Sequence, residues 1–147
     1  MGMDNLHQIL IIDDDIQFTD SKTRSWLLNY NFELVAEDNW EDGMRTLRSE
    51  EFSAVVLDVK CKKNKRSLPD EDVGFKMLYD VVDYLEKSNK NIPVFVFTGF
   101  EGKKEEWGKD GYLETIPKEI KVFVKNSEDE EKLIQEIKNS ITTSNHH

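Results

Sequence analysis

Carboxylates, a hydroxyl and an amine come directly after four short apolar segments of this chain. These residues are Asp13, Asp14, Asp15, Asp58, Thr98 and Lys125. Carboxylate oxygens are the ligands that a hard divalent cation prefers, and a lysine beside a hydroxyl suits the oxygens of an anion. If the ends of the four segments meet in space, the sequence predicts a cation site next to an anion site.

The four apolar segments are predicted to be strands of a parallel sheet. They are nearly continuous and rich in β-branched or aromatic residues, and they cover Ile9–Ile12, Ala54–Leu57, Pro93–Phe97 and Val122–Val124. Glu33–Ala36 is a weaker fifth candidate. Such uninterrupted runs are typical of strands that are buried on both faces, as the strands of parallel sheets are.

Helical periodicity fills the intervals between these strands. In the first interval Ile16, Thr19, Trp26 and Leu27 recur at helical spacing, and similar patterns cover Trp40–Leu47, Gly74–Leu85 and Leu133–Ile141. The last helix is expected to begin with a capping box made by Ser127 and Glu130. Alternating strands and helices predict a doubly wound α/β sheet with right-handed crossovers. In such a sheet ligands bind in the crevice at the carboxyl ends of the strands.

Each polar residue also has an ordinary structural explanation when it is considered alone. An aspartate at the end of a strand often caps the next helix, and Asp15 fits that role as well as a functional one. A lysine after a strand is commonly solvated, and a threonine in that position commonly makes a local hydrogen bond. The coincidence of suitable groups at four strand ends favours a functional site over these separate explanations.

Composition excludes several classes of protein. The chain has 147 residues, enough for one domain, and a formal net charge of −10; such a field repels nucleic acids and anionic membranes. The single cysteine, Cys61, excludes an internal disulfide framework. No apolar run is long enough for a membrane helix, and residues 1–6 lack the features of a signal peptide. We therefore expect a soluble cytoplasmic protein, in which His146 and His147 are the remnant of a purification tag.

The residues that follow the predicted strands make the sequence similar to a known family. The segments Ile-Leu-Ile-Ile-Asp-Asp-Asp, Val-Val-Leu-Asp-Val, Val-Phe-Thr-Gly and Phe-Val-Lys are similar to those of the receiver domains of two-component response regulators. The resemblance spans residues 7–141 and leaves residues 1–6 and 142–147 as tails. It implies a five-stranded flavodoxin-like parallel sheet in the order 2-1-3-4-5, with helices on both faces.

The resemblance also implies a role for each candidate residue. Asp58 would accept a phosphoryl group from a sensor histidine kinase or a phosphotransfer protein, while Thr98 and Lys125 would contact the phosphoryl oxygens. Mg²⁺ would be held by the carboxylates of Asp13, Asp14 and Asp58 and by the backbone carbonyl of Lys60. The domain would be regulatory rather than an enzyme, with self-catalysed, Mg²⁺-dependent phosphorylation and dephosphorylation. It would act as a monomer or weak homodimer on an output protein whose identity the sequence does not indicate.

Several positions depart from the family pattern. Val122 stands where the family usually has an aromatic switch residue, and Asn126 stands where a proline usually follows the lysine. The loops Lys60–Asp72 and Gly99–Pro117 make the chain longer than is usual between the acceptor, the threonine and the lysine. Lys60 and Phe100 hold the two positions that tune the lifetime of the phosphorylated state in this family, and we expect both side chains to lengthen that lifetime.

Two other functions compete with this interpretation. A hydrolase resembling the haloacid dehalogenase superfamily would use the Asp-x-Asp within the triple aspartate, with Thr98 and Lys125 as its further motifs. That family also needs an acidic pair at a strand end, whereas Glu128 and Asp129 fall within the predicted capping box, and Asp58 would have no role. The second alternative is a receiver-like docking module that works without phosphorylation, which the unusual Val122 suggests.

Overall fold

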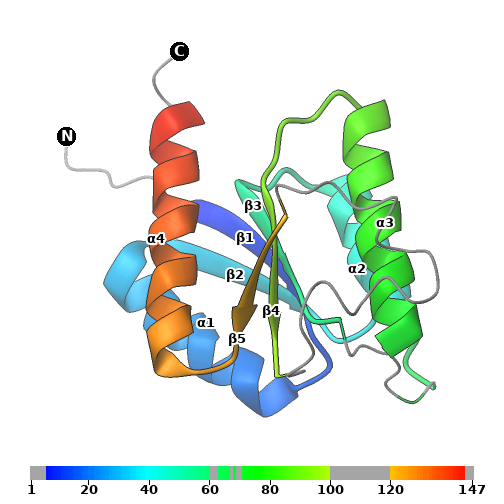
Figure 1. The fold of residues 1–147 in the computed structure, drawn as a ribbon, viewed down its shortest axis with the longest axis horizontal. Helices are drawn as coiled ribbons and strands as arrows, with labels where there is room; N and C mark the ends of the chain where they lie inside the picture. Colours follow the sequence, from blue (N-terminus) through cyan, green and yellow to red (C-terminus); the bar gives the residue numbers. More distant parts are fainter. Residues whose placement is uncertain (1–5, 60–62, 67, 69–70, 100–119, 145–147) are drawn as a thin grey trace.

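Five parallel strands form the single sheet of this computed structural model, which describes residues 6–59, 63–66, 68, 71–99 and 120–144, with the backbone alone for 71–75 and 142–144. The strands are β1 (His7–Ile12), β2 (Phe32–Glu37), β3 (Ala54–Leu57), β4 (Val94–Thr98) and β5 (Lys121–Val124). They lie in the order β2-β1-β3-β4-β5, and every neighbouring pair is parallel. The predicted sheet and its strand order are therefore confirmed (Figure 1).

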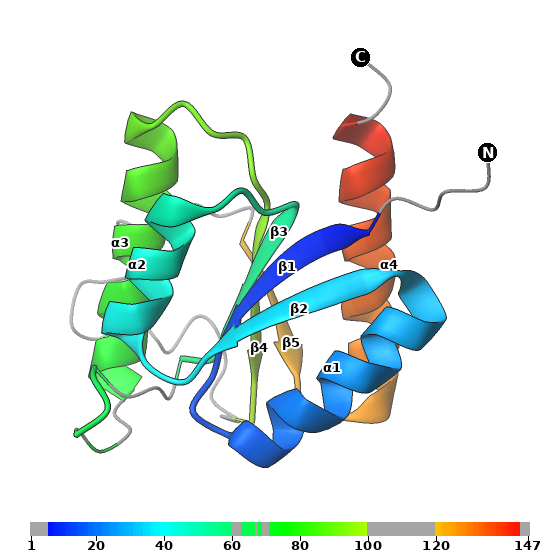
Figure 2. The same ribbon diagram turned by 180° about the vertical axis from the view of Figure 1, so that it is seen from behind.

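Helices cover both faces of this sheet. They are α1 (Ile16–Tyr30), α2 (Trp40–Ser49), α3 (Glu71–Lys87) and α4 (Ser127–Ser144). Helices α1 and α4 lie on one face, and α2 and α3 lie on the other, as the two opposite views show (Figures 1 and 2). None of the helices that the structure describes is both long and apolar enough to cross a membrane.

Alternate residues of the strands supply two cores. Ile9 and Ile11 of β1 pack with the residues of α1 and α4, whereas Leu10 and Ile12 pack with those of α2 and α3. The central strands are therefore buried on both faces, as their continuous apolar sequence predicts. The prediction was wrong for β5, whose Val124 is exposed and whose Val122 is half-buried. Strand β5 is an edge of the sheet, so fewer neighbouring side chains cover it.

The inward face of α1 differs from the predicted one. Thr19 and Trp26 are buried as expected, but Ile16 is 57% exposed and Leu27 is 38% exposed. Successive side chains of an α-helix point about 100° apart. Leu27 therefore points well away from Trp26, and the buried stripe of α1 is narrower than the sequence periodicity suggests.

Helices α3 and α4 begin at different residues from those predicted, and local polar groups explain both differences. Helix α3 begins at Glu71 rather than at Gly74, so acidic residues that sequence analysis placed in a loop belong to a first turn, where negative charge is favourable. Helix α4 is capped one residue earlier than predicted: Asn126 Oδ1 accepts a hydrogen bond of 2.8 Å from the Asp129 backbone N–H. The side chain of Glu130 is thus available for contacts with α1.

Glu130 of α4 joins this helix to α1, which covers the same face of the sheet. Its carboxylate accepts hydrogen bonds from Lys22 Nζ at 2.5 Å and from Trp26 Nε1 at 2.9 Å. The Trp26 side chain is completely buried and packs edge-on against Phe32. Because removing one partner would leave a buried polar group unpaired, this contact holds the two helices in one relative position beside the carboxyl ends of the strands.

Gly43, in the middle of α2, packs directly against Ile12 of β1. A Cβ atom at position 43 would lie 2.4 Å from Ile12 Cδ1 and 2.8 Å from Ile12 Cγ1. Alanine normally stabilises a helix interior by about 1 kcal/mol relative to glycine. Here Gly43→Ala should instead lower the free energy of unfolding by about 1–3 kcal/mol, because the core must shift to accept the methyl group. Urea unfolding measures this change.

The Ile12→Val background, which lacks Cδ1, is the matched control for this prediction. Gly43→Ala should cost less stability there than in the wild-type background. A Gly43→Ala protein as stable as the wild type would contradict the close approach of α2 to β1.

Candidate functional site

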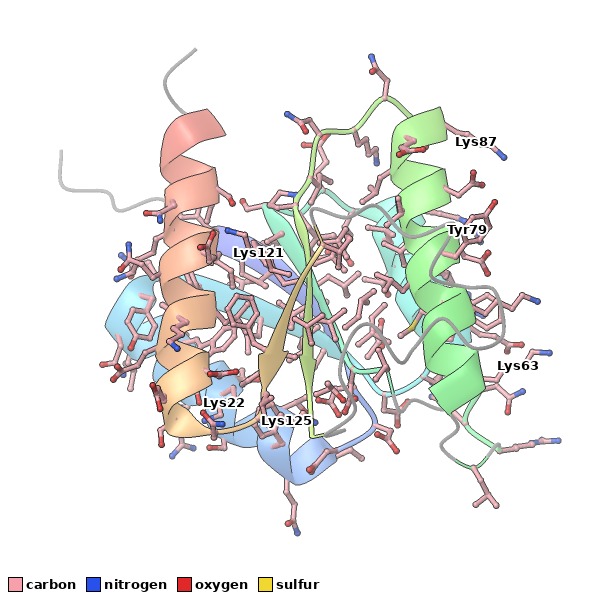
Figure 3. The ribbon with its side chains drawn as sticks, viewed as in Figure 1. Lys22, Lys63, Tyr79, Lys87, Lys121 and Lys125 are labelled. Carbon is pink, nitrogen blue, oxygen red and sulfur yellow. The ribbon has the colours of Figure 1, made fainter. Side chains whose placement is uncertain are left out.

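The predicted polar groups do meet at the carboxyl end of the sheet. Thr98 Oγ1 donates a hydrogen bond of 2.7 Å to Asp58 Oδ1, and Lys125 Nζ donates one of 2.8 Å to Asp58 Oδ2. Lys125 Nζ also lies 2.7 Å from Asp13 Oδ2. In Figure 3, Lys125 lies at the end of β5 toward which the strand points. Three strand ends therefore converge on Asp58.

Backbone hydrogen bonds continue the sheet just past the strand ends and fix these residues. The Asp13 N–H donates to the Glu37 carbonyl at 3.0 Å, and the Asp58 N–H donates to the Ile12 carbonyl at 3.0 Å. The Lys125 N–H donates to the Thr98 carbonyl at 2.9 Å. The strand order reverses between β1 and β3, which is where ligands bind in folds of this kind. Asp13 and Asp58 follow these two strands.

The three predicted metal-binding carboxylates lie close together. One oxygen from each of Asp13, Asp14 and Asp58 lies within 4.8 Å of the others; Asp13 and Asp58 are buried and Asp14 is half-buried. A set of carboxylate oxygens fits a hard cation such as Mg²⁺, which prefers oxygen ligands and keeps several of its waters. Lys60, the predicted carbonyl ligand, and Phe100 lie outside the residues that the structure describes.

Burial makes this cluster of charges unfavourable without a further cation. Desolvation, followed by the charge of Asp58, raises the pKa of Asp13 to about 7, although Lys125 and the Asp15 N–H oppose the shift. Burial by itself would lower the pKa of Lys125, but the charges of Asp13 and Asp58 outweigh it and raise that pKa. Lys125 therefore remains positively charged and partly neutralises the two acids.

Asp15 has the capping role that is the ordinary structural explanation for an aspartate in this position. Its Oδ1 accepts a hydrogen bond of 3.0 Å from the Phe18 N–H and so caps α1. Its own backbone N–H donates to Asp13 Oδ1 at 2.9 Å. Asp15 thus orients Asp13 from outside the cluster of three carboxylates.

Phe18 is a neighbour of the site that sequence analysis missed. Lys125 Nζ lies 4.5 Å from the centroid of its ring, and the ring packs against Phe97 with a centroid separation of 5.4 Å. The sequence carries one indication of this position. Phe18 lies on the first helical turn after the triple aspartate, and side chains there lean toward the helix N-terminus.

The acids required by the hydrolase alternative are used elsewhere. Asp129 Oδ2 accepts a hydrogen bond of 2.8 Å from the Val124 N–H, and Glu128 is exposed and lies 3.7 Å from Lys132. Asp58, which that alternative leaves without a role, is instead the group on which Thr98 and Lys125 converge.

Solved receiver domains resemble this chain over nearly its whole length. The receiver domain of the Francisella response regulator 1452 matches with a TM-score of 0.66 and 16% identity, covering 94% of this chain and 98% of that one. The chemotaxis response regulator CheY4 of Vibrio cholerae matches with a TM-score of 0.64 and 18% identity, covering 90% and 99%.

A CheY-like receiver domain from Methanospirillum hungatei JF-1 matches with a TM-score of 0.64 and 18% identity, covering 95% of this chain and 99% of that one. No protein-family model matches the sequence, and no curated protein does. The chain therefore has the receiver-domain fold, and the resemblance lies in its three-dimensional structure far more than in its sequence.

The raised pKa of Asp13 predicts how stability depends on pH in the metal-free protein. The folded-state pKa of about 7 lies above the ordinary value of 3.8, so the unfolded chain loses this proton at lower pH than the folded protein does. The free energy of unfolding should therefore fall as pH rises from about 4 to about 7. Asp13→Asn removes this loss and should stabilise the metal-free protein at pH 8 by at least ~1 kcal/mol.

Urea unfolding in a chelator at several pH values measures both effects. Mg²⁺ should then stabilise the wild type more than Asp13→Asn, since the metal binds only the folded state. Parallel pH profiles for the two proteins would show that Asp13 does not carry the unfavourable charge.

Proposed function

We propose that this chain is a response-regulator receiver domain in which Asp58 is the phosphoacceptor. The observation that carries the proposal is the binding of the two Asp58 oxygens to different groups, Thr98 Oγ1 and Lys125 Nζ, beside two further carboxylates. The receiver-domain fold is consistent with this function. The phosphoryl donor would be a phosphohistidine on a sensor histidine kinase or phosphotransfer protein in the cytoplasm.

The proposed reaction moves one phosphoryl group and no other atom. An oxygen of the Asp58 carboxylate forms a bond to phosphorus while the bond from phosphorus to the imidazole nitrogen breaks, and that nitrogen keeps the electron pair. The product is an acyl phosphate. Phosphoryl transfer depends mainly on positioning and on neutralising charge at the phosphoryl oxygens. Asp13 and Asp14 would hold Mg²⁺, which supplies positive charge to those oxygens.

The remaining residues would act on the new phosphate. Lys125 Nζ, now shared between Asp13 and Asp58, would donate to a phosphoryl oxygen, and Thr98 would turn its hydroxyl toward another. These shifts would change the surface around the crevice, and an output protein would recognise that change.

A docking module that works without phosphorylation is the second candidate. Val122 favours it, because this half-buried aliphatic residue packs with the α2 and α3 core and has no ring that could rotate in response to a phosphate. Partner affinity with and without beryllofluoride, a phosphoryl mimic, separates the candidates. Equal affinity would support the docking module, and tighter binding to the beryllofluoride form would support the phosphorylated receiver.

Phosphorylation of Asp58 is directly testable by mass spectrometry. Acetyl phosphate with Mg²⁺ should add one group of about 80 Da to the wild type and none to Asp58→Asn. Asp15→Asn is the matched control, because asparagine also caps helices and this residue lies beside the cluster without belonging to it. Asp15→Asn should be labelled like the wild type. Labelling of Asp13 in the Asp58→Asn protein would support the hydrolase alternative.

Metal binding is a separate prediction that needs no phosphate. Mg²⁺ should shift the amide resonances of Asp13, Asp14 and Asp58 in NMR spectra, with the weak affinity expected of a largely hydrated ion. Asp14→Asn should weaken that affinity about tenfold or more, because even the loss of a residue that only supports a metal ligand costs about tenfold. Asp15→Asn again serves as the control, and an unchanged affinity in Asp14→Asn would remove Asp14 from the site.

A further inference from the structure

We infer that Phe18 is a positioning residue whose ring holds the Lys125 ammonium against Asp58. Its proposed effect on phosphoryl transfer rests on the proposed function, whereas the contact itself can be tested without phosphate. Phe18 lies on α1, far along the chain from Lys125, and the fold brings the two together. Figure 3 shows Lys125 and Lys22 at the end of the molecule where α1 begins.

The Phe18 ring and two carboxylates surround the Lys125 ammonium. Asp13 and Asp58 lie 2.7 and 2.8 Å from Nζ, and the centroid of the Phe18 ring lies 4.5 Å from it. The Lys125 side chain is 14% exposed, so little water reaches it. A cation lying over an aromatic face is attracted by the negative charge of that face, more strongly where water is excluded. Phe18 therefore stabilises this position of the ammonium without competing for its carboxylate partners.

Phe18 is itself held by the residues that build the site. Its backbone N–H binds the Asp15 carboxylate, and the Asp15 N–H binds the Asp13 carboxylate. Its ring lies at an interplanar angle of 58° to Phe97, which is buried and immediately precedes Thr98. The ring is thus fixed relative to both Asp13 and Thr98, so it can define where Lys125 rests.

A second lysine near the ring is engaged elsewhere. Lys22 Nζ lies 5.2 Å from the Phe18 centroid, farther than Lys125 Nζ does. Its ammonium is bound to Glu130 at 2.5 Å, within the contact that joins α1 to α4. Lys22 is therefore held by α4, while Lys125 is the cation that the ring shares with the reactive carboxylate.

The Phe18 ring limits the conformational freedom of the long Lys125 side chain. Lysine has four rotatable side-chain bonds, and holding it in one arrangement is entropically costly. Without the ring, Lys125 should sample positions in which its charge does not face the phosphoryl oxygens, and such misplacement slows a reaction that depends on positioning. The attraction depends on the electrons of the ring and not only on its apolar bulk.

The first experiment compares three variants in their rates of phosphorylation by acetyl phosphate with Mg²⁺. Phe18→Leu should slow phosphorylation of Asp58 about five- to tenfold, where tenfold corresponds to about 1.4 kcal/mol, and Phe18→Tyr should restore a rate close to that of the wild type. Tyr30→Leu is the matched control. Tyr30 is the last residue of the same helix, at the opposite end from Phe18. Lys138 Nζ lies 4.7 Å from the centroid of its ring. This control should leave the rate unchanged.

Fluorinated phenylalanines at position 18 separate positioning from packing. Successive ring fluorines withdraw electrons from the ring face and leave its shape nearly intact, so the phosphorylation rate should fall stepwise with each fluorine. A rate that Phe18→Leu lowers but that fluorination leaves unchanged would overturn the inference and make Phe18 a packing residue only.

A double-mutant cycle tests the contact when no phosphate is present. In urea unfolding, Phe18→Leu and Lys125→Met should be coupled by about fivefold or more in the folding equilibrium constant. Additive effects would overturn the inference even if Asp58 is phosphorylated normally. If the two substitutions are strongly coupled but acetyl phosphate does not label the protein, the contact is supported and the proposed function is rejected.

Discussion

The burial of carboxylates at one end of a parallel sheet is the main electrostatic constraint on this structure. Asp13 and Asp58 are both nearly inaccessible to water, and Asp14 lies within reach of them. The ammonium of Lys125 touches both buried acids. Burial and then the neighbouring charge raise the pKa of Asp13 to about 7, so this carboxylate is costly to ionise in the folded protein and additional positive charge would stabilise it.

The topology explains how the chain holds such an arrangement. Strand order reverses between β1 and β3, so the chain leaves the sheet toward opposite faces after Asp13 and Asp58. Backbone hydrogen bonds to Glu37, Ile12 and Thr98 carry the pairing past the strand ends. The two cores on either side of the sheet supply the apolar burial that offsets the repulsion. The sheet is therefore the scaffold, and the unfavourable burial of charge is confined to the carboxyl ends of its strands.

Aromatic rings are placed differently from the pattern that the family resemblance implies. Position 122 holds an aliphatic residue beside the core of α2 and α3, whereas Phe18 places a ring against Lys125 from the opposite face of the sheet. The contact among Lys22, Trp26 and Glu130 lies next to that ring and joins α1 to α4. Lys125, Phe18 and Lys22 therefore form a chain of contacts between Asp58 and this pair of helices.

Local sequence patterns were sufficient for most of the elements and for the polar residues that meet at the strand ends. Apolar continuity identified β1, β3 and β4, and the residues directly after the strands identified Asp13, Asp58, Thr98 and Lys125, because parallel strands bring their carboxyl ends together. The strand order came from the resemblance to a family. Only the tertiary structure revealed that β5 is partly exposed, that Asn126 caps α4, and that Glu130 binds Trp26 and Lys22 of α1. It also revealed the ring of Phe18 over Lys125. These features depend on contacts between residues distant along the chain, and periodicity within one segment carries no information about which distant side chain will face it.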